Sequence, residues 1–286
     1  MKRYALPTLI IILLLTSLAC QITINAPKLP KGDVLDQPET LNINEPAPSV
    51  SGSQLEVSMG AGKLNITGGG QGLVTGTVRY NVAQLKPSIS RNGNLVTIDQ
   101  DETDSIVGLG TDLINEWNLA LGIPPMGLKV NAGAYEGTLA LGGIPLTSLE
   151  INDGASKSEV TFDTANPQTM DKLSYKTGAS QVEMTGLANA NFREMTFDSG
   201  AGSYTLDFGG ELKQDASVRI TSGVSDFKVI IPANMRARIE VDGALNNVTQ
   251  RGTWTVTNRV YETGGSGPLL TIEVEMSVGQ LELVHQ

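Results

Sequence analysis

Few side chains in this sequence could carry covalent chemistry. Its 286 residues include one histidine, His285, and one cysteine, Cys20. His285 lies next to the last residue, where disorder is the ordinary expectation, so we do not expect a serine or cysteine nucleophile with a histidine base. A single cysteine also excludes an internal disulfide and a cysteine-ligated zinc site. The sequence has neither a phosphate loop nor a dinucleotide fingerprint, and it therefore predicts a protein that is not an enzyme, with no catalytic residue, metal or cofactor.

Carboxylates are the remaining candidates for chemistry, and four of them cluster: Asp99, Asp101, Glu102 and Asp104. Parallel β-helices of the pectate lyase type use acidic residues with calcium to act on sugar acids. This leaves a calcium-dependent carbohydrate-active enzyme of the polysaccharide lyase kind as an alternative function. The spacing matches neither an EF-hand loop nor the glycine-rich nonapeptide calcium repeat, so a solvated acidic loop is the favoured interpretation.

A second polar set is distinguished by its spacing. Its members occupy the same place in successive copies of one repeated segment: Asn131, Asn152, Lys176, Asp198 and Thr221. If the copies stack on one another, these side chains form a ladder along an outer face. Amide, hydroxyl and charged groups in a row suit hydrogen bonding to a glycan or a partner protein. Simple solvation of an outer face is the alternative interpretation, as is a purely structural spacer without a ligand.

The repeated segment organises the sequence from residue 128 to residue 248. Its copies open at Leu128, Leu149, Leu173, Met195 and Val218, which lie 21, 24, 22 and 23 residues apart. In each copy, apolar residues stand at the opening position and two places later, a glycine follows at the fifth place, and apolar alternation then resumes. Alternation with period two predicts strands with one buried face. The glycine predicts a corner between two strands with a positive φ.

This fixed period predicts an all-β fold, a parallel β-solenoid (β-helix) of about 21–24-residue coils. The same pattern occurs in residues 55–66 and, with serine at the corner, in residues 272–283, and these two copies are expected to pair with the series or cap it. Another copy is expected at Ile239, 21 residues after Val218. An antiparallel sandwich is the alternative, but sandwich strands vary in length and turn type, whereas this repeat keeps a strict register.

The sequence divides into five predicted regions. They are a lipoprotein-type signal peptide at 1–20, a proline-rich, flexible and disordered tether at 21–53, an N-terminal β region with a cap and the first coil at 54–127, repeated coils at 128–248, and strands that close the solenoid at 249–286. Within the N-terminal region, residues 74–80 and 95–98 are expected to form a hairpin-like pair of strands that turns at residues 91–94, and residues 117–121 alternate as a strand. Residues 106–114 are compatible with a short helix.

The first region predicts where the protein resides. Lys2 and Arg3 precede an apolar run and then small residues before Cys20, which is the layout of a secretory leader. Residues 16–20 resemble the bacterial lipoprotein box, in which the cysteine becomes the lipid-bearing first residue. We therefore expect an extracytoplasmic protein anchored to the bacterial cell membrane by lipid on Cys20; an ordinary signal peptide or an uncleaved anchor is the alternative. The net charge of -10 makes nucleic acid an unexpected partner.

Several segments together resemble a known family. They are residues 55–66, residues 117–121 with Pro124 and Pro125, the repeated Gly-Ala coils, residues 230–232 and residues 278–283. In these the chain is similar to the bacterial toast rack proteins, which are related to the adhesin-like and cell-wall-active antibiotic response domains of bacterial envelopes. The resemblance covers nearly all of the chain from Leu55 onward. It implies a β-solenoid of the cell envelope, with adhesin-like behaviour and no catalytic residues.

Overall fold

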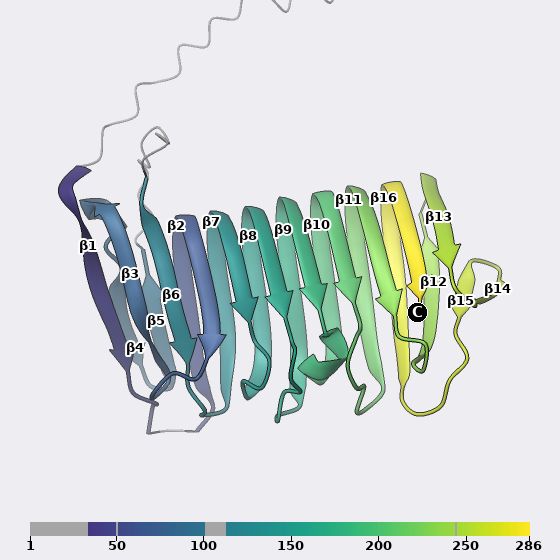
Figure 1. Ribbon diagram of the computed structural model, residues 1–286, viewed down its shortest axis with the longest axis horizontal. Helices are drawn as coiled ribbons and strands as arrows, with labels where there is room; N and C mark the ends of the chain where they lie inside the picture. The colour runs from purple at the N-terminus through teal and green to yellow at the C-terminus, as the bar shows by residue number, and fades with distance from the viewer. Residues whose placement is uncertain (1–33, 50, 101–112, 244) are drawn as a thin grey trace, which may run out of the picture.

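The computed structural model describes residues 34–49, 51–100, 113–243 and 245–286 (Figure 1). They form strands and two short 3-10 helices, η2 (Ala83–Leu85) and η3 (Leu187–Ala190), with no α-helix among the residues described. The all-β prediction is confirmed. The expected signal peptide, Cys20 and most of the helix considered at 106–114 lie outside the described residues.

All strands belong to one mixed sheet. Those of the N-terminal part are β1 (Val34–Glu45), β2 (Ser53–Gly68), β3 (Val74–Val82), β4 (Ser88–Asn92), β5 (Leu95–Asp99) and β6 (Asn115–Leu121). The central strands are β7 (Met126–Ala140), β8 (Leu146–Thr161), β9 (Met170–Thr185), β10 (Phe192–Asp207) and β11 (Ala216–Ile231). The C-terminal strands are β12 (Arg236–Asp242), β13 (Leu245–Arg251), β14 (Thr255–Thr257), β15 (Val260–Glu262) and β16 (Leu269–His285).

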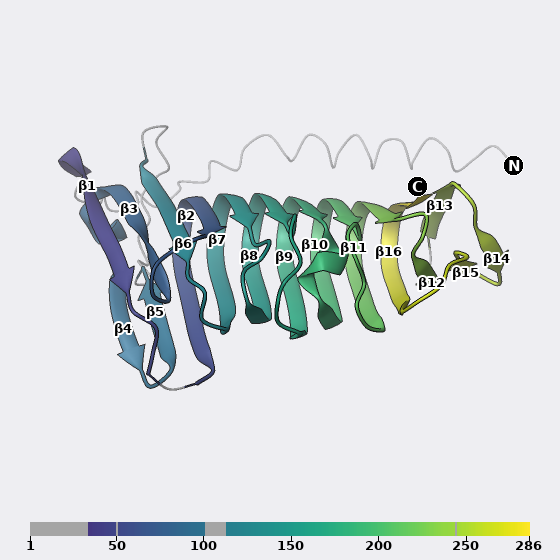
Figure 2. The same cartoon turned by 60° about the horizontal axis from the view of Figure 1, so that its bottom comes forward.

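The central strands β7 to β11 follow one another in the sheet and pair in parallel. Figures 1 and 2 show that each of them folds over near its middle, so that its first half lies in one layer and its second half in a facing layer. The pairing joins equivalent positions of successive copies: Ile151 lies beside Tyr175, Tyr175 beside Phe197, and Phe197 beside Ile220. Equivalent side chains therefore stand in columns across the sheet.

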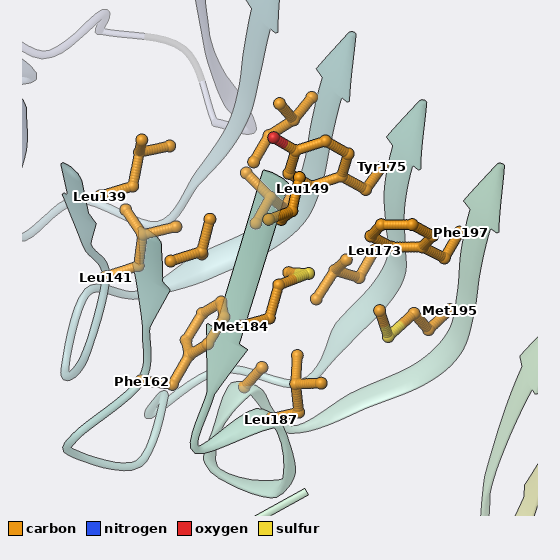
Figure 3. Close-up of a cluster of buried hydrophobic side chains, with 14 of the residues drawn as sticks. Leu139, Leu141, Leu149, Phe162, Leu173, Tyr175, Met184, Leu187, Met195 and Phe197 are labelled. Carbon is orange, nitrogen blue, oxygen red and sulfur yellow. The ribbon is translucent and has the colours of Figure 1, made fainter. Parts of the chain in front are cut away.

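The core fills the space between the two layers (Figure 3). Leu149, Leu173 and Met195 form one column of opening residues, each at most 1% exposed. In the neighbouring column the rings of Tyr175 and Phe197 stack with centroids 5.3 Å apart. The alternation in the sequence produces this arrangement, because every second side chain of a strand points inward.

The corner positions require glycine for a reason other than the one that the sequence predicted. The expected positive φ is wrong, because Gly133, Gly154, Gly178, Gly200 and Gly223 are absent from the glycines of positive φ. A Cβ on Gly178 would instead lie 2.5 Å from the carbonyl oxygen of Gly154, and one on Gly200 would lie 2.5 Å from that of Gly178. Neighbouring strands approach so closely at the corner that a side chain would meet the backbone of the preceding strand.

The row of folded strands from β2 to β16 is flanked on each side by two shorter strands that together match one folded strand. At the N-terminal end, β5 pairs with the first half of β2 and β6 with its second half. At the C-terminal end, β12 and β13 pair in the same way with β16. The copy at Ile239 therefore does not lie beside Val218, because Ile272 of β16 pairs with both of them.

Two predictions for the N-terminal part need correction. The tether expected over residues 21–53 is wrong for β1, which pairs antiparallel with β3 and buries Ile43 to 2% exposure. Alternating apolar residues within the proline-rich stretch allow this strand to form. The expected pairing of residues 74–80 with residues 95–98 is also wrong. The turn at residues 91–94 joins β4 to β5, and β3 lies between β1 and β6. The strand expected at residues 117–121 is confirmed and forms most of β6.

Replacing Gly178 by alanine tests the close approach at the corner. The new Cβ forces the backbones of β8 and β9 apart, and we expect a loss of about 1–3 kcal/mol in the free energy of unfolding. Valine should cost more, because its larger side chain needs a greater shift. Gly264→Ala is the matched control, since a Cβ there meets no atom within 4 Å. Equal melting temperatures of the Gly178→Ala and Gly264→Ala variants, measured by circular dichroism, would contradict this account.

Candidate functional site

The structure places the predicted polar ladder on five neighbouring strands. Strand pairing sets Asn131 beside Asn152, Asn152 beside Lys176, Lys176 beside Asp198, and Asp198 beside Thr221. All five lie in the first halves of β7 to β11, at positions that are half-buried or exposed. The stacking of successive copies brings these positions together, because the ladder residues precede the corner by the same number of residues in each copy.

The first two rungs of the ladder are bonded to one another. Asn152 Nδ2 donates to Asn131 Oδ1 at 3.0 Å and to Glu150 Oε1 at 2.8 Å. Asn131 Nδ2 donates to Glu56 Oε1 at 2.8 Å. Among the described residues, Lys176 and Asp198 have no ion pair, although they are neighbours. Lys176 on β9 and Asp198 on β10 therefore place two charges on the outer side of the sheet.

A shallow open groove of about 350 Å³ runs along the ladder. Its lining residues come from β8 to β11 and are Asn152, Asp153, Lys176, Thr177, Asp198, Ser199 and Thr221. Four of the five ladder residues thus border one groove. The other lining residues, Asp153, Thr177 and Ser199, each directly follow a ladder residue in the sequence. All of the lining residues are of polar types.

Asp153 is at the centre of a hydroxyl cluster under this groove. Its Oδ2 accepts hydrogen bonds from Tyr175 Oη at 2.8 Å and from Ser156 Oγ at 3.0 Å. Its Oδ1 accepts from Ser180 Oγ at 3.2 Å and from Thr177 Oγ1. Four hydroxyl groups therefore stabilise one carboxylate. Three of these hydrogen bonds join β8 to β9 at the corner.

Two buried tyrosines lie beside the cluster. Burial, with the nearby Asp153 charge as a further cause, raises the pKa of Tyr135 to about 12, although its hydrogen bond to Tyr175 acts in the opposite direction. Burial also raises the pKa of Tyr175, whose hydroxyl lies 2.6 Å from Ser158 Oγ. Both phenols are therefore protonated near neutral pH. They act here as hydrogen-bonding groups of the core.

Sequence reasoning missed Asp153. A signal was present, because the residue before the corner glycine is a hydroxyl residue in the next three copies: Thr177, Ser199 and Ser222. These hydroxyls continue the polar corner beyond Asp153. Ser199 Oγ donates to Ser222 Oγ at 2.9 Å, and the hydroxyls of Ser222 and Ser225 lie 2.7 Å apart.

Two more hollows lie on the outer side of the same layer, each of about 190 Å³. One spans β2 to β9 and has the polar lining residues Gln54, Lys129, Ser148, Glu150, Lys172, Ser174 and Lys176. The other spans β11, β16 and β12 and has the polar lining residues Arg219, Glu240, Asp242, Glu273 and Glu275. Lys176 borders both the first hollow and the groove. We call the outer side of the first strand halves, from β2 to β12, the polar face.

The other candidates of the sequence are placed differently. Cys20, Asp101, Glu102 and Asp104 lie outside the described residues, and Asp99 is a half-buried residue at the end of β5. The described part of the chain holds no group of three or more acidic, histidine or cysteine side chains suited to a metal ion. In the same residues, no helix has the length and apolar character needed to cross a membrane.

The expectation that His285 is disordered is wrong. It ends β16, and its ring nitrogens lie 2.8 Å from the carbonyl oxygen of Thr253 and 3.2 Å from that of Ala233. The imidazole also packs against Trp254, with ring centroids 5.7 Å apart. The last strand is held on both sides, so its terminal residue is ordered with it.

A family model matches the chain over residues 35–172 and 164–230, and its description is the N-terminal domain of toast_rack, DUF2154. The chain belongs to the toast rack family. The match covers β1 to β11, which includes the ladder and the groove. No curated protein matches the sequence.

Solved structures resemble this toast rack chain over most of its length. One is "a putative cell adhesion protein" from Clostridium sporogenes, with 19% identity and a TM-score of 0.49, covering 87% of this chain and 99% of the other. Another is "a putative adhesin" from Bacteroides fragilis, with 11% identity and a TM-score of 0.46, covering 87% of this chain and 97% of the other.

Replacing Asp153 by alanine tests the hydroxyl cluster. Four donors lose their common acceptor, and we expect the free energy of unfolding to fall by about 1–3 kcal/mol. Asp198→Ala is the matched control on the neighbouring face, where no hydrogen bond is lost, and its effect should stay within about 0.5 kcal/mol. Urea unfolding followed by tyrosine and tryptophan fluorescence measures both. Equal losses in the two variants would refute the role given to Asp153.

Proposed function

We propose that this toast rack chain is a non-catalytic protein of the bacterial cell envelope, held at the membrane by lipid on Cys20. It presents a rigid β-solenoid of about 21–24-residue coils for adhesion or envelope sensing, and its polar face binds a glycan or a partner protein. The observation that carries the binding role is the ladder from Asn131 to Thr221, whose residues lie side by side and four of which border one polar groove.

The pairing of strands supports the coil size. Leu128 pairs with Leu149, Leu149 with Leu173, Leu173 with Met195, and Met195 with Val218. These partners are one sequence period apart, so each period adds one turn of the backbone to the stack. Rigidity follows from this arrangement, because each central strand is bonded on both sides along its two halves.

The leader supports the location. Residues 1–20 combine two basic residues, an apolar run and small residues before the only cysteine of the chain. Lipid chains contribute about 0.8 kcal/mol for each buried methylene, so a cysteine carrying several acyl chains would be anchored stably. A binding face on a rigid body outside the membrane is useful for contact with envelope polymers or with another surface.

The mature amino terminus tests the anchor. Mass spectrometry of the protein isolated from cell membranes should find Cys20 as the first residue, with its mass increased by lipid. Cys20→Ser should abolish both the lipid and the processing at that position. A mature chain that begins elsewhere without lipid would contradict the anchor, as would equal membrane binding of the Cys20→Ser variant.

Binding to isolated envelope polymers tests the polar face. We expect Asp198→Ala combined with Thr221→Ala to reduce retention of the full-length protein about tenfold or more, since both side chains border the groove. Glu183→Ala combined with Thr205→Ala is the matched control on the outer side of the second strand halves. Equal retention of the two double variants would place binding elsewhere, and no retention of the unaltered protein would contradict a polymer ligand.

A further inference from the structure

The hollow between β2 and β9 has a charge that differs from that of the whole protein. The chain carries a net charge of -10, yet this hollow of about 190 Å³ is bordered by Lys129, Lys172 and Lys176 against a single carboxylate, Glu150. The three lysines lie near one another because Lys129 is on β7, the other two are on β9, and only β8 separates these strands. An acidic protein that gathers three lysines at one hollow creates a local site for an anion.

Two of these lysines form no ion pair within the part of the chain that the structure describes. Lys129 Nζ lies 3.0 Å from Glu56 Oε1, so its charge is already paired. Among the described residues, Lys172 and Lys176 form no ion pair, even though strand pairing sets Glu194 beside Lys172 and Asp198 beside Lys176. Both side chains are exposed on β9, four residues apart, and point to the same side of the strand.

Uncharged hydrogen-bonding groups converge next to the lysines. Gly127 lies between Gln54 and Ser148 in the strand register. A Cβ on Gly127 would lie 2.1 Å from Gln54 Oε1 and 2.6 Å from Ser148 Oγ, so only glycine lets these two side chains close over this position. The carboxamide and the hydroxyl can each donate and accept a hydrogen bond. Such groups suit the hydroxyls of a sugar.

The one carboxylate that borders the hollow, Glu150, already accepts one hydrogen bond. Glu150 Oε1 accepts a hydrogen bond from Asn152 Nδ2 at 2.8 Å. Its second oxygen is able to accept from a sugar hydroxyl. Ser174, which is 4% exposed, forms part of the floor and accepts a hydrogen bond from Thr196 Oγ1 at 3.1 Å. The hollow therefore combines cationic groups at its β9 side with groups that accept and donate at its β8 side.

We propose that this hollow binds an acidic saccharide, with Lys172 and Lys176 holding the sugar carboxylate and with Gln54, Ser148 and Glu150 bonding to its hydroxyls. The inference rests on the proposed binding role of the polar face and adds the chemical class of the ligand. Bonds between an ammonium group and a carboxylate are about twice as strong as neutral hydrogen bonds. Affinity should therefore come mostly from the two lysines, and selectivity from the neutral groups.

Calorimetric titration of the full-length protein with trigalacturonate at low ionic strength tests the proposal. We expect binding that weakens about tenfold or more in the Lys172→Gln, Lys176→Gln double variant, because truncating the partners of a carboxylate removes its charge-assisted bonds. The matched control is Lys157→Gln with Lys228→Gln, which changes the charge equally on the second strand halves and should keep the affinity. The carboxyl-reduced trisaccharide should bind at least about tenfold more weakly than the acid, for the same physical reason.

Three outcomes would overturn the proposal. They are no binding of trigalacturonate, equal affinities of the unaltered protein and the Lys172→Gln, Lys176→Gln variant, and binding of inorganic phosphate as tight as that of the trisaccharide, which would show an anion site without sugar recognition. Circular dichroism of each variant checks that its fold is intact. If envelope polymers still require Asp198 and Thr221 in any of these cases, the polar face keeps its proposed function and only this ligand is lost.

Discussion

The close approach of successive folded strands at the corner is the constraint on which the rest of this structure depends. Each corner glycine stands over the carbonyl oxygen of the glycine before it, at a distance that leaves no room for a Cβ. From β7 to β11 this contact limits how each strand can shift past its neighbour, and the apolar columns on either side of the corner stay in register. Hydrophobic burial stabilises the stack and also maintains its alignment, because a slip by one residue would turn the apolar side chains to the outer face. The polar ladder exists for the same reason, because its residues are aligned by the corner that follows them.

The ends of such a stack are its weak points, since an open coil presents unpaired strand edges. Here the first and last full copies of the repeat, β2 and β16, do not lie at the ends. Each is paired on both sides, and shorter strands from within the sequence cover it. The outermost strand at one end, β1, contains Pro38 and a register shift between Val34 and Glu39, which discourage the addition of another strand. The terminal copies are therefore held by their neighbours.

The sequence predicted the features that recur in every copy of the repeat and missed those that occur at one place only. The period gave the strands, their inward residues and the neighbours of each ladder position, because every copy repeats the same information. It could not decide which copy follows β11, since Glu240 and Glu273 occupy equivalent positions and either one complements Arg219. Strand β16 takes that place and Arg219 pairs with Glu273. The cluster around Asp153 was also missed, because it depends on side chains from two copies whose hydroxyl groups look like ordinary surface residues in a linear sequence.

The composition of the ladder supports the proposed role in ligand binding better than a role in joining neighbouring strands. Identical amide side chains in a stack can bond to one another, as Asn152 does with Asn131 at 3.0 Å. A ladder that served only to join the coils would gain by repeating asparagine. Instead it continues as Lys176, Asp198 and Thr221, which gives up that bond and leaves charged groups facing the groove. Outward positions can change in this way without disturbing the core, because they alternate with the buried ones. The buried positions thus stabilise the fold, and the proposed binding role depends on the outward ones.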